Sequence, residues 1–241
     1  MAMSLIEDLA AANRILAEHG VIDGYGHVSV RSDRDAQRYF LSRAIAPELM
    51  TEHDIMEYDL DSTPIDPQGR ESVQERFIHG EIYKTRPEVN AVVHNHSPSV
   101  IPFGITAEPL RPIFHMAAFV GLGVPTFEIR DAEEGTDLLV KTSYLGQALA
   151  RTLGTKPAAL MRGHGAVVVG ENLPRAVGRS IYLEISAKLQ VQAMTIAGPR
   201  GKIVCMDERE VHASVPPQNY GRAWNMWRTK ALAQMRSQTG K

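Results

Sequence analysis

Two histidines separated by one residue, His94 and His96, are the most specific chemical feature of this 241-residue sequence. They close the apolar run 89–96, which is typical of a strand. Side chains two residues apart on a strand point to the same face, so the two imidazoles would lie side by side and could form half of a metal site. The alternative is a pair of surface histidines at a strand end, and the spacing alone fits both interpretations.

A third histidine lies in the segment Arg162-Gly163-His164-Gly165, between the apolar stretches 158–160 and 166–169. The glycines permit a tight backbone and the close approach of another group. A lone Gly-His-Gly is usually a turn. Together, however, the three histidines could supply nitrogen ligands and leave open positions for water or substrate, which is the composition of a catalytic metal site.

Glu75 and His79 stand four residues apart in a predicted helix over 72–85 and would share one helix face. A solvated helix face is the ordinary interpretation of such a pair. Glu75 becomes a candidate metal ligand or general acid/base only if this helix packs beside the strand at 89–96.

The elements that must position these residues alternate between helix and strand along the chain, which predicts an α/β domain. We expect a single domain over residues 1–241, because no linker divides it. The predicted strands cover 26–31, 38–42, 54–60, 89–96, 123–129, 158–160 and 166–169, and the predicted helices cover 5–19, 72–85, 135–153, 174–197 and 219–236, with a short helical turn at 98–104.

Composition excludes several classes of function. The formal net charge is -2, which gives no footprint for nucleic acid. No apolar run reaches the roughly 20 residues that span a bilayer, and the first residues do not form a signal peptide. The single cysteine, Cys205, excludes an internal disulfide framework and suits a reducing, cytoplasmic setting. A Walker A motif and a Gly-x-Ser-x-Gly elbow are both absent.

Over roughly residues 5–215 the sequence resembles the class II aldolase/adducin family. The resemblance is carried by Glu75, by the run 86–96 with His94 and His96, and by the His164 motif. It implies an α/β/α sandwich around a mostly antiparallel sheet. It also implies one divalent metal ion per subunit, held by the three histidines, with Glu75 as catalytic carboxylate and resting ligand. Mn²⁺ or Zn²⁺ is expected, and Fe²⁺ or Co²⁺ is possible. The family further implies a homo-oligomer, usually a tetramer, with sites at subunit contacts.

The sequence departs from the sugar-phosphate aldolases of this family. Their phosphate-binding Gly-Asn pair is Gly26-His27 here, and their Ser-Ser pair before the catalytic carboxylate is Val73-Gln74. A different segment, 42–47, replaces their phosphate loop, and Met116 stands in place of a catalytic tyrosine. These departures argue against a phosphosugar substrate.

The pattern is closer to the decarboxylase branch, which acts on hydroxylated aromatic or pyridine dicarboxylates. Planar guanidinium groups suit carboxylates, so Arg43 or Arg162 is predicted to hold one. The proton donor is left open between three residues, and further residues are predicted near the substrate. The donors are Glu75, His27 and His79, and the substrate-site residues are Ser42, His115 and Tyr220.

The sequence thus predicts a metal-dependent lyase that decarboxylates a small hydroxylated aromatic or pyridine carboxylate. Breaking a carbon–carbon bond leaves electrons on carbon, and a chelated metal can stabilise that charge. One alternative is an aldolase or epimerase that acts on a sugar or sugar phosphate. Another is a non-catalytic, adducin-like interaction module, and a metal hydrolase is a third.

Overall fold

One seven-stranded sheet forms the centre of the structure, a computed structural model that describes residues 5–214 and 220–238. The strand order is β3-β2-β1-β4-β7-β6-β5, and all neighbouring strands pair antiparallel except β5 with β6. The strands are β1 (His27–Arg31), β2 (Arg38–Ser42), β3 (Ile55–Asp59), β4 (Ala91–Asn95), β5 (Thr126–Phe127), β6 (Ala158–Met161) and β7 (Gly165–Gly170).

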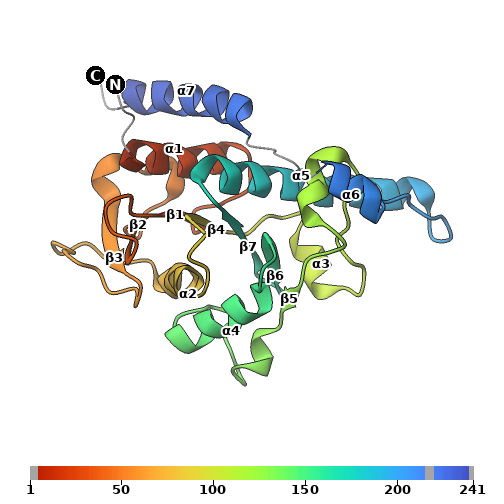
Figure 1. The fold of residues 1–241 in the computed structure, drawn as a ribbon, viewed down its shortest axis with the longest axis horizontal. Helices are drawn as coiled ribbons and strands as arrows, with labels where there is room; N and C mark the ends of the chain where they lie inside the picture. The colour runs from red at the N-terminus through yellow and green to blue at the C-terminus, as the bar shows by residue number, and fades with distance from the viewer. Residues whose placement is uncertain (1–4, 215–219, 239–241) are drawn as a thin grey trace.

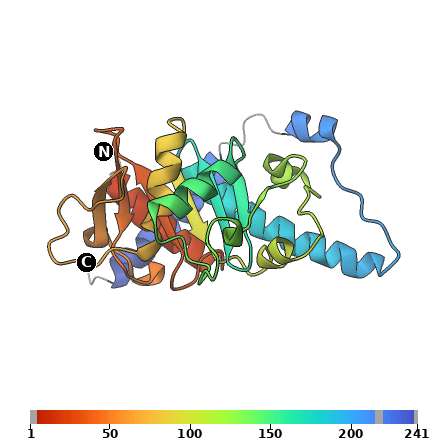
Figure 2. The same ribbon diagram turned by 90° about the horizontal axis from the view of Figure 1, so that it is seen from below.

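Helices cover both faces of this sheet, as Figure 1 shows. On one face lie α1 (Leu5–Glu18) and α5 (Leu173–Ala197), with α7 (Gly221–Gln238) packed outside α1. On the other face lie α2 (Phe77–Thr85) and α4 (Ser143–Leu153), which are seen in front of the sheet in Figure 2. The predicted α/β/α sandwich with a mostly antiparallel sheet is therefore confirmed.

Alternation along the central strands divides the core into two layers. Val93 of β4 packs in the cluster with α1 and α5, whereas its neighbour Val92 packs in the cluster with α2 and α4. His94 follows Val92 by two residues and therefore points to the same side as Val92. In β1 the same rule places His27 and Ser29 on the α2 side, because Val28 packs against α1 and α5.

Several predicted boundaries are wrong. The helix over 135–153 begins only at Ser143, where the Thr142 side chain accepts the Leu145 N–H. Before it, Gly135 and Leu138 have φ of 69° and 72°, which a right-handed helix does not allow.

The strand over 123–129 is reduced to β5. Helix α7 spans Gly221–Gln238 where 219–236 was predicted, and residue 219 lies outside the described residues. Two short helices lie between the main elements, α3 (Ile101–Ile105) at the predicted turn and α6 (Glu208–Ser214), which was not predicted.

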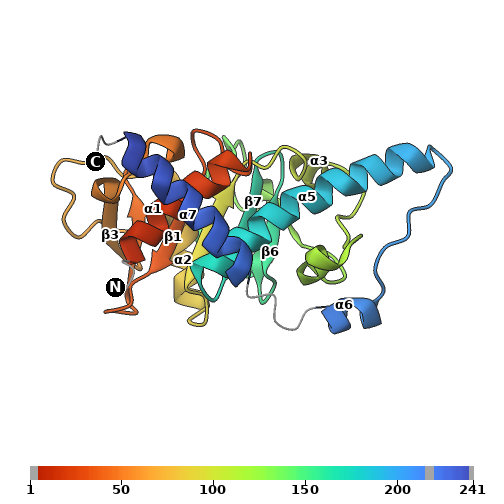
Figure 3. The ribbon, with the colours of Figure 1, turned by 90° about the horizontal axis from the view of Figure 1, so that it is seen from above.

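Helix α5 is the longest element and extends past the edge of the sheet, as Figure 3 shows. It begins after Asn172, whose side chain caps the first turn, and ends at Gly198, whose φ is 72°. Within the described ranges, no helix is both long enough and apolar enough to cross a membrane.

Candidate metal centre and its cavity

His94 and His96 lie together at the end of β4. The side chain of His94 is fully buried on the α2 face, and its residue pairs with His27 of β1 on one side and Val167 of β7 on the other. His96 follows the strand, and its Nε2 atom lies 3.2 Å from Nε2 of His94. The two imidazoles meet as the alternating pattern predicts.

His164 reaches the same point from the tight connection between β6 and β7. Gly163 has a φ of 65°, a left-handed conformation that glycine adopts without strain. A Cβ atom at Gly165 would lie 1.9 Å from the carbonyl oxygen of Asn95, so β7 can approach the end of β4 only without a side chain there. As a result, Nε2 of His164 lies 3.0 Å from Nε2 of His96.

Glu75 completes the cluster from the α2 side. It lies in a 3₁₀ turn, Gln74–Arg76, with non-helical angles (φ -86°, ψ 20°), so the expectation that it shares a face of α2 with His79 is wrong. One carboxylate oxygen accepts the Val140 N–H at 2.9 Å. The other lies 3.4 Å from Nε2 of His94 and 3.5 Å from Nε2 of His164.

The charges in the cluster are strongly coupled. Burial alone raises the pKa of Glu75, but the imidazoles of His94 and His164 outweigh burial and hold that pKa far below its usual range. Burial lowers the pKa of His94. Burial also opposes protonation of His164, but the Glu75 carboxylate outweighs it and raises the pKa of that imidazole. Glu75 is therefore an anion that faces imidazole nitrogens.

Hydrogen bonds on the far side of two rings fix their tautomers. Nδ1 of His96 lies 3.0 Å and 3.1 Å from the carboxylate oxygens of Asp23, and Nδ1 of His164 lies 2.8 Å from the carbonyl oxygen of Leu138. Both partners only accept hydrogen bonds, so the Nδ1 atoms carry the hydrogens. In the neutral rings the Nε2 lone pairs then face each other.

This arrangement fits a divalent metal ion. Metal–nitrogen bonds of about 2.0–2.1 Å place neighbouring ligand atoms about 2.8–3.4 Å apart in octahedral or tetrahedral sites. The three Nε2 atoms and the Glu75 oxygen are separated by 3.0 to 3.5 Å where they approach, and one ligand atom from each of the four residues lies within 4.8 Å of the others. A cation would relieve the repulsion between the facing lone pairs.

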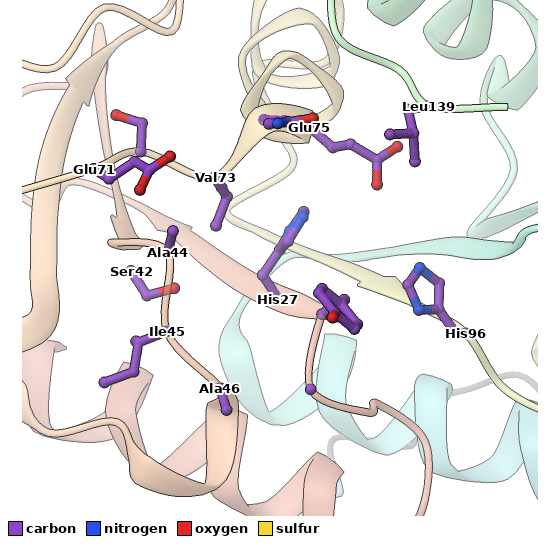
Figure 4. Close-up of a pocket in the computed structure, with 15 residues that line it drawn as sticks. His27, Ser42, Ala44, Ile45, Ala46, Glu71, Val73, Glu75, His96 and Leu139 are labelled. Carbon is purple, nitrogen blue, oxygen red and sulfur yellow. The ribbon is translucent and has the colours of Figure 1, made fainter. Parts of the chain in front are cut away.

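The cluster opens into a cavity of about 570 Å³. Figure 4 shows Glu75 and His96 at one end, His27 between, and Glu71 with the 42–46 loop at the other end. The side chains that line it include two carboxylates, and none of the described lining residues is a lysine or an arginine. The lining residues are Gly24, Tyr25, Gly26, His27, Ser42, Ala44, Ile45, Ala46, Glu71, Ser72, Val73, Gln74, Glu75, His96 and Leu139.

Two predicted residues, His27 and Ser42, lie in the cavity wall, whereas His79 lies behind it. His79 is fully buried, and its Nε2 atom is 2.7 Å from Nδ1 of His27. Burial lowers the pKa of His79 to about 3 and that of His27 well below its usual range. Both rings are therefore neutral near pH 7, and only His27 borders the cavity.

The two predicted carboxylate-binding arginines are in ion pairs instead. Nε of Arg43 lies 2.7 Å from Asp54, and Nε of Arg162 lies 2.8 Å from Glu128. Neither arginine is among the described residues that line the cavity, although Arg43 follows Ser42 and Arg162 is two residues from His164. Their roles in binding substrate stay predictions.

His115 and Tyr220 are also outside this cavity. His115 is exposed in a 3₁₀ segment, His115–Val120, beside Phe114. Tyr220 is buried, stacks on Tyr182 with ring centroids 5.7 Å apart, and covers Gly178 of α5, where a Cβ would meet its ring at 2.3 Å. Their contacts with substrate stay predictions.

Sequence reasoning missed three residues that shape the site. Asp23 and the Leu138 carbonyl orient two imidazoles, and Glu71 places a second carboxylate in the cavity. Asp23 is 73 residues from His96 in the chain, and no local motif connects them.

The sequence is similar to a known protein family and to known decarboxylases. Residues 7–191 match the family described as Class II Aldolase and Adducin N-terminal domain. Decarboxylase tropJ of Talaromyces stipitatus is 37% identical over 235 residues, covering 88% of each chain. A 3,4-dihydroxyphthalate decarboxylase of Arthrobacter keyseri is 30% identical over 207 residues, covering 80% of this chain and 79% of that protein.

The fold also matches a solved aldolase. L-fuculose 1-phosphate aldolase from Glaciozyma antarctica PI12 superposes with a TM-score of 0.76 at 25% identity, over 98% of this chain and 90% of the other. The structure thus has the fold of a sugar-phosphate aldolase, and the sequence aligns over most of its length with two decarboxylases.

Proposed function

Because the chain belongs to the class II aldolase and adducin family, we propose that it is a metal-dependent carboxy-lyase that acts on a hydroxylated aromatic or pyridine carboxylate. Decarboxylase and aldolase relatives support lyase chemistry in general. The narrower assignment draws on the two decarboxylases, one of which acts, by its name, on 3,4-dihydroxyphthalate.

The observation that carries the proposal is the convergence of His94, His96, His164 and Glu75 at one end of the cavity. An adducin-like module would have no need for this cluster. Two of its imidazoles are held in the tautomer that directs a lone pair inward, which is how metal-binding histidines are commonly arranged. We propose Mn²⁺ or Zn²⁺ as the bound ion, with Fe²⁺ and Co²⁺ as alternatives.

The metal ion and the residues around it have different proposed roles. A bound divalent ion supplies Lewis acidity toward oxygens next to the bond that breaks. Glu75 places its negative charge between the imidazoles. A divalent ion and the Glu75 carboxylate would therefore carry a net charge of one positive unit together. His27 borders the space in front of the cluster with one ring nitrogen engaged by His79. Since proton delivery needs a protonated group at the cavity surface, we propose His27 for it, because Glu75 is held as an anion and His79 is fully buried.

The charge of the cavity limits the substrate. Its described lining carries Glu71 and Glu75 and no lysine or arginine. An anionic group therefore binds best next to the cluster, where the net charge is positive. At the opposite end, Glu71 and Ser42 favour hydroxyl or other hydrogen-bond donors over a second carboxylate.

The experiment is a metal-controlled assay. Protein stripped with a chelator and reloaded with Mn²⁺ or Zn²⁺ is given hydroxylated aromatic monocarboxylates, aromatic dicarboxylates and sugar phosphates. We expect carbon dioxide from an aromatic acid only after reloading. Release of an aldehyde from a sugar phosphate would establish the aldolase alternative, and equal activity in stripped protein would exclude metal-dependent chemistry.

We also propose that the protein acts as a homo-oligomer. The protruding half of α5 exposes large apolar side chains, of which Ile196 is 87% accessible, and Val204 in the following segment is 91% accessible. Such clustering is typical of a surface that another subunit covers. Light scattering on the purified protein tests this, and a monomer at micromolar concentration would contradict it.

A further inference from the structure

A chain of hydrogen bonds runs from the cavity wall into the interior through three side chains behind His27. Nδ1 of His27 lies 2.7 Å from Nε2 of His79, Nδ1 of His79 lies 2.6 Å from Oγ of Ser29, and this Oγ lies 2.8 Å from the Tyr83 hydroxyl. All four residues are at most 3% accessible. Of these four residues, the proposed function uses only His27 and gives no role to His79, Ser29 and Tyr83.

The hydrogens in this chain can point in one of two directions. Among the described residues no carboxylate forms an ion pair with either imidazole, and a neutral imidazole carries a single N–H. In the inward-to-outward order, Tyr83 donates to Ser29, Ser29 donates to Nδ1 of His79, and Nε2–H of His79 donates to Nδ1 of His27. In the reverse order, the Tyr83 hydroxyl accepts from Ser29 and must place its own hydrogen elsewhere.

The surroundings of Tyr83, at the inner end of this hydrogen-bond chain, favour the order in which Tyr83 donates to Ser29. Across residues 5–214 and 220–238, Oγ of Ser29 is the only acceptor that contacts the Tyr83 hydroxyl, because its other partner, the Val92 N–H, is a donor, and Tyr83 is 1% accessible. The reverse order therefore leaves a buried hydroxyl hydrogen without an acceptor, which costs about 1–3 kcal/mol. The Arg31 guanidinium, 4.7 Å from the centre of the Tyr83 ring, also favours the donor role by drawing electron density from the phenol.

We propose that Tyr83, Ser29 and His79 fix His27 in the tautomer with its hydrogen on Nε2, so that His27 presents an N–H donor to a substrate oxygen. His27 lines the cavity and is the cross-strand neighbour of His94, with ring centroids 5.1 Å apart. A donor there would face an oxygen that gains negative charge during carbon–carbon cleavage. This role rests on the proposed function, and it makes His79, Ser29 and Tyr83 positioning residues.

The decisive experiment reads the tautomer directly. Long-range ¹H–¹⁵N correlation spectra of histidine-labelled, zinc-loaded protein distinguish protonated from unprotonated ring nitrogens. We expect a protonated Nε2 and an unprotonated Nδ1 for His27. A spectrum with the hydrogen on Nδ1, or with averaged tautomers, would overturn the proposal even if decarboxylation is demonstrated. The spectrum does not depend on turnover, so a failed assay for carbon dioxide leaves this result standing.

Variants separate positioning from packing. His79→Leu keeps a buried side chain of similar size but removes the donor, and we expect mixed tautomers of His27. Its kcat should fall roughly tenfold or more, short of the 100-fold that deletion of an oxyanion donor typically costs, with KM nearly unchanged. His79→Gln retains an amide N–H at the corresponding position and should restore the single tautomer and much of kcat.

The matched control is Tyr39→Phe, which removes another buried phenol hydroxyl, bonded to Ser62 and outside this chain. We expect the His27 spectrum and kcat to stay as in the parent protein. Retention of a fixed Nε2–H tautomer in His79→Leu would contradict the proposal. If that variant does not fold, the parent spectrum and the spectrum of Ser29→Ala, in which His79 loses its hydroxyl donor, still decide the question.

Discussion

The Nε2 atoms of His96 and His164 face each other at 3.0 Å, although the two residues are 68 positions apart in the chain. Each ring commits its Nδ1 hydrogen to an oxygen, from Asp23 or from the Leu138 backbone. Two neutral rings held this way direct lone pairs at one another, an arrangement that a cation stabilises. The facing lone pairs are the structural reason to expect tight metal binding.

Loss of a ligand should remove the ion. We expect His94→Ala to lower the affinity for Mn²⁺ or Zn²⁺ by more than about 100-fold, beyond the 10- to 100-fold typical of an outer-shell change, and to abolish turnover. Elemental analysis after dialysis against a metal buffer measures occupancy. His212→Ala, on the exposed surface of α6, is the control. Full occupancy in His94→Ala would refute the ligand assignment.

The hydrogen bond from His96 to Asp23 should tune that affinity. Asp23→Asn keeps an acceptor for the Tyr25 and Gly26 N–H groups but removes the charge beside the imidazole. We expect metal binding to weaken about tenfold, at the low end of outer-shell effects. Isothermal titration calorimetry with Zn²⁺ measures the affinity of this variant, and Asp33→Asn in an exposed turn is the reference. Equal affinities in the two variants would show that Asp23 does not act on the site.

The pairing of His94 with His96 could be predicted from sequence because it is local, whereas His164 joins them from a segment 68 residues away from His96. Alternation places His94 and His96 together on one side of a strand end, and glycines on both sides of His164 allow the close approach of β7. Glu75 needed the family resemblance, since its position in a 3₁₀ turn before α2 breaks the helical spacing that first linked it to His79.

The remaining site could not be predicted, because it depends on contacts between distant segments. A planar guanidinium suits a substrate carboxylate, but the sequence does not show that Arg43 pairs with Asp54 and Arg162 with Glu128. The same limit explains the helix predicted over 135–153. Its apolar pattern is helical, whereas the left-handed Leu138 instead brings its carbonyl oxygen to His164.

Replacement of Arg162 tests whether its guanidinium binds the substrate carboxylate. Its guanidinium pairs with Glu128, and Arg162 is not among the described residues that line the cavity. We therefore expect Arg162→Met to change KM for the aromatic acid by less than about threefold, a difference that corresponds to under 1 kcal/mol. Steady-state kinetics on the metal-loaded enzyme measure it. A tenfold rise in KM would support the predicted carboxylate-binding role of Arg162, and a similar rise in Arg43→Met would support that of Arg43.

Gly165 should be required for both stability and metal affinity. A methyl group there would collide with the Asn95 carbonyl oxygen and push β7 away from β4. We expect Gly165→Ala to lower the free energy of unfolding by about 1–3 kcal/mol, as overpacking commonly does, and to weaken Zn²⁺ binding. Urea unfolding measures the first effect. In Gly104→Ala the added methyl has ordinary 3.5 Å contacts, so that variant should unfold as the parent does.

Acid should destabilise the fold through its buried histidines. In the native state burial lowers the pKa of His79 to about 3, whereas an unfolded chain has the ordinary value near 6.5. Between these values the unfolded state binds more protons, so stability falls as pH decreases through this window. From pH 7 to pH 5 the expected loss from this one residue is about 2 kcal/mol.

Urea unfolding of metal-free protein at pH 7 and pH 5 checks this loss, with His79→Gln as the comparison. Glutamine does not titrate, so the variant should lose about 2 kcal/mol less than the parent over the same interval. Parallel pH profiles for the parent and His79→Gln would show that His79 is protonated as readily in the folded protein as in the unfolded chain.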